Sequence, residues 1–272
     1  MAVFDLADGL RMHYEVFGAS ANRPVIVFLN GTAQTTTNWR PLALRLQERC
    51  RVILYDARCQ GRSGCGSGPL TLAQHAYDLV RLLDALALEQ VGLVGLSHGA
   101  RIALAATERM TTRIDGLMLL SLGLTSSART ALAFAAWREL LQSGGLAALF
   151  QAMMPMVFGE RFLREHQAVI AKVAEALVQR NDEDKMLRLL AAIDDYPAVK
   201  ASLPAQPVTT MVMTGADDLL VSEEEGRALA EQLGGGYQLL PDVGHSIPAE
   251  SPDLLIDGIE RFFKLAQGTS AS

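Results

Sequence analysis

The sequence has few cysteines, and their number and spacing bear on where the protein works. Only three of its 272 residues are cysteine, namely Cys50, Cys59 and Cys65. A disulfide scaffold is not expected in a chain this long, so all three are interpreted as free thiols in a reducing compartment. The N-terminus has no basic stretch ahead of an apolar run, so no secretory signal is expected. The cytoplasm is therefore the predicted location.

Basic charge and long apolar runs are also lacking. The formal net charge of −6 argues against nucleic acid as the main partner, because binding phosphates needs a basic surface. No uninterrupted apolar run is long enough to cross a bilayer, so a soluble protein without a membrane partner is expected. Half of the residues are nevertheless apolar, which is enough for one large core or a core with a small insertion.

Short apolar runs alternate with helical patterns along most of the chain. After a hairpin that turns at Asp8-Gly9, continuous β-branched runs are typical of strands buried on both faces. These runs lie at Pro24–Leu29, Arg51–Tyr55, Val91–Leu96, Ile114–Leu122, Val208–Thr214 and Tyr237–Leu240. Helix starts are predicted at the capping box Thr71-x-x-Gln74 and at Ser251-Pro252. The alternation predicts an α/β fold, with a mostly parallel central sheet covered by helices on both faces.

One region breaks the alternation. From about Thr125 to Pro204 the sequence shows helical patterns and no strand, with Gly144-Gly145, Pro155 and Pro197 as breaks. This region is interpreted as an inserted helical cap. The predicted domains are therefore a first core part over 1–124, the cap over 125–204 and a second core part over 205–272.

A serine lies in a motif that suits a nucleophile. Gly95-Leu96-Ser97-His98-Gly99 fits G-x-S-x-G, follows a buried strand and precedes a predicted helix from Ala100 to about Met110. Such a serine sits on a sharp turn that lifts its hydroxyl out of the sheet, and small neighbours permit the turn. The backbone N–H of His98, at a helix N-terminus, is then free to bind an oxyanion.

A serine hydroxyl needs a base within hydrogen-bond reach, and there are five histidines. His13 lies in the hairpin and is expected at the surface, while His75 and His166 are expected to be solvated or to pack. His98 leaves the turn in another direction, so it is a poor base and a candidate for lining the pocket. His245 remains, in a loop after the last short strand, where Gly244 allows a tight turn.

The base needs an acid that orients it and stabilises its imidazolium. Asp217 and Asp218 directly follow the strand predicted at Val208–Thr214. We favour Asp218, because it lies further past the strand end, and keep Asp217 as the alternative. No acidic residue follows the preceding strand, which excludes that position.

The second oxyanion donor is expected in the loop after Pro24–Leu29. This loop reads Asn30-Gly31-Thr32. Gly31 would let the backbone approach a substrate, and the Thr32 N–H is the candidate donor. Asn30 and Gly31 are candidates for contact with the substrate, and an ordinary Asn-Gly turn is the alternative interpretation.

Together these motifs resemble those of the α/β-hydrolase superfamily, whose triad has the same Ser…Asp…His chain order. Asp56-x-Arg58 running into Gly61-Arg62-Ser63 is similar to the family's arginine loop, and Gly244-His245 with Glu250 to its histidine loop. Asn30 stands where the family often has His, and Cys59 where it often has Gly. The first half is most similar to lactonases of the enol-lactone type, and the stretch from Asn30 to Trp39 also to hydroxyalkanoyl-ACP transferases.

The resemblance implies acyl transfer through Ser97. The predicted function is serine-dependent hydrolysis of a small-molecule carboxylic ester, lactone or thioester, with no metal or cofactor. One alternative passes the acyl group to an acceptor other than water, and an acyl carrier would be a partner of that kind. Another is a ligand-binding protein on a hydrolase fold. A serine nucleophile argues against a dehalogenase or epoxide hydrolase, because those use an aspartate there.

The cap is predicted to form the apolar side of the substrate pocket. Flexible and aromatic side chains cluster around Pro155, namely Phe150, Met153, Met154, Met156 and Phe158. Methionine adapts to flexible apolar groups, so Phe150, Met153 and Met154 are candidates for substrate binding. The alternative is that these residues only pack the cap onto the core.

Overall fold

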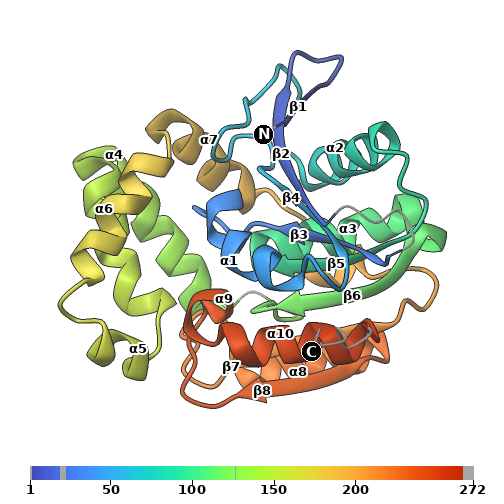
Figure 1. The fold of residues 1–272 in the computed structure, drawn as a ribbon. Helices are drawn as coiled ribbons and strands as arrows, with labels where there is room; N and C mark the ends of the chain where they lie inside the picture. Colours follow the sequence, from blue (N-terminus) through green and yellow to red (C-terminus); the bar gives the residue numbers. More distant parts are fainter. Residues whose placement is uncertain (1, 19–22, 126, 266–272) are drawn as a thin grey trace.

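The computed structural model describes residues 2–18, 23–125 and 127–265 and contains an eight-stranded sheet. The strands lie side by side in the order β1-β2-β4-β3-β5-β6-β7-β8 (Figure 1). Their bounds are β1 Ala2–Asp5, β2 Arg11–Phe17, β3 Val25–Leu29, β4 Arg51–Tyr55, β5 Val91–Leu96, β6 Ile114–Leu120, β7 Thr210–Gly215 and β8 Gly236–Leu240. β1 pairs with β2 and β2 with β4 in antiparallel fashion, and every other pair is parallel. The predicted mostly parallel sheet is confirmed.

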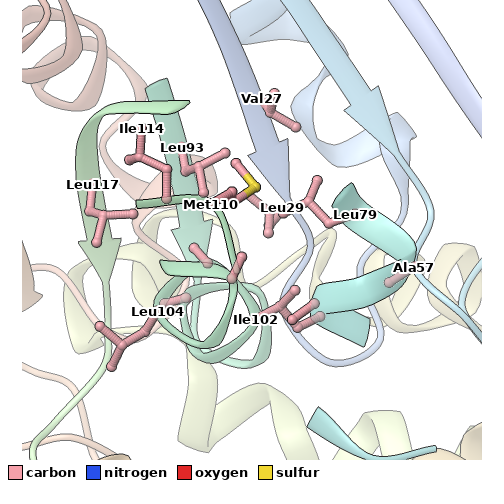
Figure 2. Packing of buried hydrophobic residues seen from close by; sticks show 14 of the residues in the cluster. Val27, Leu29, Ala57, Leu79, Leu93, Ile102, Leu104, Met110, Ile114 and Leu117 are labelled. Carbon is pink, nitrogen blue, oxygen red and sulfur yellow. The ribbon is translucent and has the colours of Figure 1, made fainter. Parts of the chain in front are cut away.

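Helices cover both faces of this sheet, as the continuous apolar runs require. Along β3, Val27 and Leu29 enter one buried cluster, and Ile26 and Phe28 enter the other. Residues of α2 (Leu72–Ala85), α3 (His98–Met110) and α8 (Glu223–Leu233) complete the first cluster, part of which Figure 2 shows. Residues of α1 (Thr36–Leu46) and α10 (Pro252–Phe262) complete the second. All of β5 is therefore buried, and so is every residue but one of β3, β4 and β6, because side chains alternate between two covered faces.

The predicted helix starts are found, although the capping box expected at Thr71 is only half formed, since the Gln74 side chain donates to Asp78 instead. Thr71 is the N-cap of α2, and its hydroxyl accepts a bond from the Gln74 backbone N–H at 3.2 Å. Ser251 precedes Pro252 at the start of α10, but its side chain makes no capping bond. A short helix, α9 (Ile247–Glu250), ends at that serine.

Between β6 and β7 the described chain contains helices and no strand. They are α4 (Ala128–Val157), α5 (Glu160–Glu165), α6 (Ile170–Arg180), α7 (Glu183–Asp194) and the 3-10 helix Val199–Ser202; a second 3-10 helix, Thr111–Arg113, precedes β6. The inserted helical region is confirmed, and Figure 1 shows α4 and α6 beside the sheet rather than on it. The domain boundaries at 124/125 and 204/205 stay predictions.

α4 is long enough to cross a membrane and contains an 18-residue window with a mean hydropathy of 1.3, which the sequence argument did not anticipate. Gly145, with φ 68° and ψ −172°, breaks α4 into two shorter helices at the predicted Gly-Gly position. Trp137, Leu149 and Met153 of α4 are buried in a third apolar cluster with residues of α6 and α7. These apolar side chains of α4 thus pack within the cap.

The prediction of three free thiols is wrong for two of them. Cys59 and Cys65 form a disulfide, while Cys50 is free and buried. Burial raises the pKa of the Cys50 thiol to about 12. The prediction failed because it rested on the number of cysteines, whereas a tight loop brings these two together. With this pair oxidised, the cysteines no longer support a reducing compartment, and the cytoplasmic location stays a prediction.

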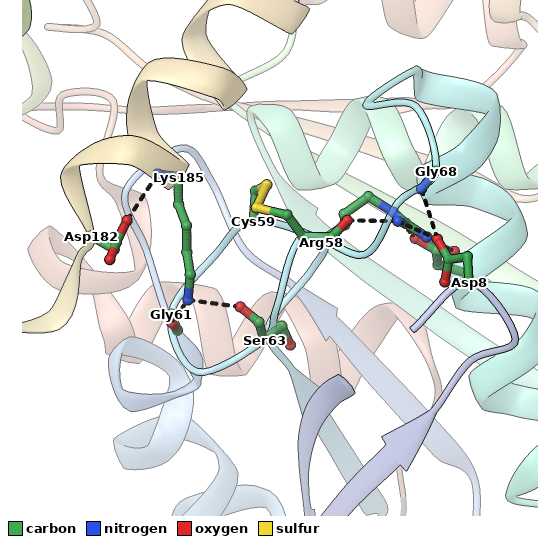
Figure 3. The surroundings of a disulfide bond; sticks show 10 residues. Asp8, Arg58, Cys59, Gly61, Ser63, Gly68, Asp182 and Lys185 are labelled. Carbon is green, nitrogen blue, oxygen red and sulfur yellow. Dashed lines mark hydrogen bonds and ion pairs between the residues drawn. A yellow bond between two sulfur atoms is a disulfide. The ribbon is translucent and has the colours of Figure 1, made fainter. Parts of the chain in front are cut away.

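The disulfide closes the loop that follows Arg58, and this loop joins several parts of the molecule (Figure 3). The buried Arg58 guanidinium bonds Asp8 at 2.6 Å and Asp78 at 2.8 Å. Within the loop, Gln60 Nε2 donates to the Gly31 carbonyl at 2.9 Å. From α7, Lys185 Nζ donates to the carbonyls of Gly61 and Ser63, at 3.2 and 2.9 Å. One loop therefore contacts both the Gly31 segment and the cap.

The prediction that His13 lies at the surface is wrong. Only 4% of it is exposed, because it shares a face of β2 with Glu15, and Thr36 and Arg40 of α1 bond Glu15 on that face. Its Nε2 lies 3.0 Å from Glu15 Oε1. Burial alone would raise the pKa of Glu15, but bonds from Arg40, His13 and Thr36 lower it to about 2.

Candidate active site

Ser97 occupies a strained turn between β5 and α3. Its φ of 50° and ψ of −109° lie in a region that residues with a side chain rarely adopt. A Cβ added at Gly95 would lie 2.6 Å from the Ala100 backbone nitrogen, and one at Gly99 would lie 2.2 Å from the Leu29 carbonyl oxygen. Both glycines of the motif are therefore required by the close approach of backbone atoms. This is the tight strand-to-helix turn that the sequence predicts.

His245 is held by Asp218 on the loop after β7. His245 Nδ1 lies 2.8 Å from Asp218 Oδ2, and both residues are less than a tenth exposed. The other carboxylate oxygen, Oδ1, accepts the backbone N–H groups of Leu220 and Val221, at 2.8 and 3.0 Å. Of the two aspartates considered from the sequence, the structure brings Asp218 to the histidine. The bond at Nδ1 leaves Nε2 of the ring for a second partner.

The loop that carries His245 has its own supports. The Glu250 carboxylate accepts the backbone N–H groups of Gly159, Gly244 and Ser246, at 2.8, 2.9 and 3.1 Å. Burial outweighs these bonds and raises the pKa of Glu250. Ser121 Oγ donates to the His245 carbonyl at 2.9 Å. The histidine backbone is thus tied to the end of β6 and to the cap.

Two backbone N–H groups are available near Ser97. His98 is the first residue of α3, so its N–H has no acceptor within the helix. Thr32 lies beyond β3, in a segment fixed by bonds between Gly31 and the side chains of Gln34 and Gln60. The Thr32 hydroxyl is buried and has no hydrogen-bond partner in the described part of the chain.

Two cavities meet at Ser97. One has a volume of about 520 Å³ and the other about 210 Å³. Five residues line both: Thr32, Ser97, Phe134, Leu220 and His245. The larger cavity runs along α3 toward the end of the cap and carries charged side chains. The smaller one is mainly apolar and lies between the Gly31 segment and the cap helices.

The structure brings most of the predicted site residues to these cavities. Gly31, Met153 and Met154 line the smaller cavity, as does Phe158. The larger cavity is lined by the side chain of His98, as the sequence predicts. These residues surround Ser97 on two sides.

Two predicted substrate contacts, Asn30 and Phe150, line neither of these two cavities. Asn30 donates from Nδ2 to the Tyr55 carbonyl at 3.0 Å and to Asp56 Oδ1 at 3.2 Å, so its amide holds the arginine loop. Phe150 is fully buried in the apolar cluster of the cap. Phe150 therefore packs within the cap, as the alternative interpretation of this stretch holds.

Two other histidines pack near the site without being candidates for the base. His98 Nε2 lies 3.2 Å from the Tyr196 hydroxyl, and the His75 ring meets His98 edge-on, with centroids 5.0 Å apart. Burial lowers the pKa of His98 well below 6.5. Burial, and then the charge of Arg58, lower the pKa of His75 to about 3. Both rings are therefore neutral near pH 7.

Sequence reasoning missed Arg101 and Tyr196, which line the larger cavity. Arg101 could have been found, because it lies four residues after Ser97 on a predicted helix and so on the same face. Tyr196 could not, because it lies beyond α7 and meets His98 only through the fold. The described residues contain no group of three His, Cys, Asp or Glu that could hold a metal ion.

Residues 26–257 match the family model described as "Alpha/beta hydrolase family". The chain belongs to the α/β-hydrolase family. This α/β hydrolase is 28% identical, over 95% of its length and 100% of the relative's, to the "Putative carbamate hydrolase RutD" of Agrobacterium fabrum. It is 25% identical, over 97% and 99% of the two chains, to "3-oxoadipate enol-lactonase 2" of Acinetobacter baylyi.

Solved structures show the same fold. The enol-lactonase from Burkholderia xenovorans matches with a TM-score of 0.85 and 26% identity, over 94% of this chain and 97% of that one. A thermophilic esterase from Thermogutta terrifontis matches with a TM-score of 0.83 and 25% identity, over 95% of both chains. The relatives thus include lactone, ester and carbamate hydrolases that share nearly the whole chain.

Proposed function

We propose that this α/β hydrolase cleaves a small-molecule carboxylic ester, lactone or thioester through an acyl-enzyme on Ser97. The observation that carries the proposal is the hydrogen bond between His245 Nδ1 and Asp218 Oδ2, because His245 also lines both cavities together with Ser97. A buried carboxylate on Nδ1 fixes the tautomer in which Nε2 can accept a proton. The strained turn at Ser97 suits a nucleophile.

The first half of the reaction forms the acyl-enzyme. Ser97 Oγ attacks the carbonyl carbon while His245 Nε2 takes the hydroxyl proton. The backbone N–H groups of Thr32 and His98 would bind the resulting oxyanion, and losing one such donor costs about 100- to 1000-fold in rate. As the tetrahedral intermediate collapses, His245 gives the proton to the leaving oxygen or sulfur, and Asp218 stabilises the imidazolium meanwhile.

The second half of the reaction releases the carboxylic acid product. Water loses a proton to His245 Nε2, attacks the acyl-enzyme carbonyl and displaces Ser97 Oγ, which takes the proton back. In a lactone the leaving oxygen stays attached to the acyl group, so one hydroxy acid is released. The names of the enol-lactonase and esterase relatives support this class of substrate. The apolar part of the substrate would occupy the smaller cavity, beside Met153 and Met154.

Acyl transfer to an acceptor other than water uses the same first half. The larger cavity, with about 520 Å³, has room for an alcohol or for the end of a carrier-bound thiol. Product analysis with and without an added alcohol distinguishes hydrolysis from transfer. A binding protein with little turnover would not need the arrangement of Ser97, His245 and Asp218.

The test is Ser97→Ala, which should reduce ester hydrolysis by about 10⁴- to 10⁶-fold, since removal of a triad member typically costs that much in kcat. A fluorophosphonate probe should label the wild-type protein at Ser97 and leave the variant unlabelled. Circular dichroism and a thermal melt would show that the variant is folded. More than a few per cent of residual activity in the purified variant would contradict the assignment.

A further inference from the structure

The wall of the larger cavity carries a guanidinium that has no carboxylate partner. Arg101 lies one helical turn beyond Ser97 at the start of α3, where its backbone N–H donates to the Ser97 carbonyl at 3.0 Å. Both line the larger cavity. Across residues 2–18, 23–125 and 127–265 no ion pair of Arg101 is found. Asp194 lies on the same wall, but its carboxylate is paired with Arg138.

The contacts that Arg101 does make leave part of its hydrogen-bonding capacity unused. Nη2 donates to the Pro197 carbonyl, and the guanidinium carbon lies 5.3 Å from the centroid of the Tyr196 ring. Nε is buried without an acceptor among the described residues. Burial lowers the pKa of Arg101, yet an arginine stays charged at any physiological pH. A half-buried cation without an opposite charge is costly unless a ligand supplies that charge.

The two cavities also differ in charge. The described residues that line the smaller cavity include no Asp, Glu, Lys or Arg, and most are apolar. Among the described residues that line the larger cavity, Arg101 is the one charged side chain left without an opposite charge. A substrate whose carbonyl lies at Ser97 would therefore meet an apolar pocket on one side and an uncompensated positive charge on the other.

We infer that Arg101 is a specificity-determining residue that binds a carboxylate on the substrate. The preferred substrates are then esters or lactones with an apolar group on one side of the reacting carbonyl and a free carboxylate on the other. A single planar guanidinium matches a monoanionic carboxylate, whereas a phosphate dianion calls for more donors than this wall offers. The inference rests on the function proposed for Ser97.

The experiment uses pairs of esters that differ only in charge. Monoethyl glutarate and its monoamide, ethyl glutaramate, place the carboxylate or its neutral isostere in the acyl part. 4-Acetoxybutyrate and 4-acetoxybutyramide place it in the alcohol part. In at least one pair, the wild-type kcat/KM should favour the carboxylate by about 10- to 100-fold, the usual range for a hydrogen bond to a charged group. The pair that shows this preference tells whether the acyl part or the alcohol part of the substrate faces Arg101.

Arg101→Met should bring this ratio close to one. The matched control is Arg109→Met, which removes the same charge from the same helix at an exposed position about 12 Å further along and should keep the ratio. Glutarate should also inhibit hydrolysis of a neutral ester by the wild-type protein competitively, with an inhibition constant at least about tenfold lower than that of glutaramide. This last measurement needs no variant, so it stands even where Arg101→Met does not fold.

The outcomes separate the two proposals. Wild-type ratios near one in both pairs, or equal inhibition by glutarate and glutaramide, would overturn the role of Arg101 while hydrolysis and Ser97 labelling persist. An equal loss on both members of a pair in Arg101→Met would show that Arg101 only holds the Tyr196–Pro197 segment, which also overturns it. Absence of hydrolysis and of Ser97 labelling in the wild-type protein would overturn the proposed function and this inference together.

Discussion

The core and the cap surround Ser97 in different ways. In the core, close contacts between backbone atoms fix the residues next to Ser97, whereas the cap contributes mainly apolar side chains. At Gly99 the Leu29 carbonyl leaves no room for even a methyl group. The cap wall of the smaller cavity consists of flexible and aromatic side chains, such as Met153, Met154 and Phe162. Backbone crowding allows one geometry, while unbranched side chains can repack. Under the functions proposed above, the comparison teaches that the chemistry belongs to the core and that substrate choice is left to the cap and to the wall at Arg101.

The largest expected effect concerns the acid of the core. Asp218→Asn should lower kcat by about 10⁴-fold, because an amide on Nδ1 favours the wrong histidine tautomer. Asp217→Asn is the matched control, since that side chain is not bonded to His245, and it should be far milder. Steady-state kinetics on a neutral ester measures both. A reversed ranking would move the role to Asp217, and two mild effects would mean that neither orients the base.

The next largest effect is expected from adding a side chain at the crowded turn around Ser97. Gly99→Ala should lower the free energy of unfolding by about 1–3 kcal/mol, as overpacking typically does, because the new Cβ meets backbone that cannot step aside. Gly64→Ala, whose Cβ would meet nothing closer than 3.8 Å, should be close to neutral. Urea denaturation of both variants checks this. Equal stabilities would show that the turn tolerates a side chain and would weaken the contrast with the cap.

The buried histidines of the core give a pH-dependent effect. His75 has a pKa of about 3 in the fold because it is buried, against about 6.5 in an unfolded chain. Between these values the unfolded chain binds a proton that the folded one does not, so stability falls as the pH is lowered from about 6.5 toward 3. The slope is about 1.4 kcal/mol per pH unit for one such group.

His75→Leu should remove the contribution of His75 to this dependence of the free energy of unfolding on pH. Denaturant melts of the wild-type protein and the variant at several pH values between 4 and 7 would measure it. The difference in stability between the two should change steadily with pH in the variant's favour as the solution becomes more acidic. Parallel curves would contradict the assignment of the slope to His75.

The smallest effects are expected in the cap. Each buried methylene is worth roughly 0.8 kcal/mol, so kcat/KM should rise by up to about fourfold per added methylene until the smaller cavity is full. Met153→Ala and Met154→Ala should each move the optimum to a longer chain. Met186→Ala is the control, because Met186 is buried in the same cluster without lining either cavity. A flat profile that no variant changes would place the apolar part of the substrate elsewhere.

The fold could be predicted because its signals are local. The β-branched runs of the central strands are continuous since both faces of the sheet are covered, and only the ends differ by a residue or two. The turn at Ser97 and the loop at His245 were found for a similar reason: glycine is needed where backbones nearly touch, and that need is visible in a short motif. Asp218 followed from the end of a strand.

The remaining parts depend on contacts between distant segments. Asn30 looked like a substrate contact because of its place after β3, yet its amide is turned toward Asp56. Nothing near Cys59 in the sequence shows that Cys65 folds back onto it. In the structure the buried Arg58 also holds this segment, since its Nη1 donates to the Cys65 carbonyl at 2.7 Å. Phe150 and Met153 share one helix, and only the packing of α4 decides which of them reaches the cavity.

The spread of the site along the chain has a consequence for synthesis on the ribosome. Ser97 follows the fifth strand, whereas Asp218 and His245 come after the seventh and eighth. Domains generally begin to fold from the N-terminus as they are made. A nascent chain can therefore present the nucleophile long before its partners have been translated. Under the proposed function, hydrolysis therefore requires translation past His245, and copies that end before this residue are inactive.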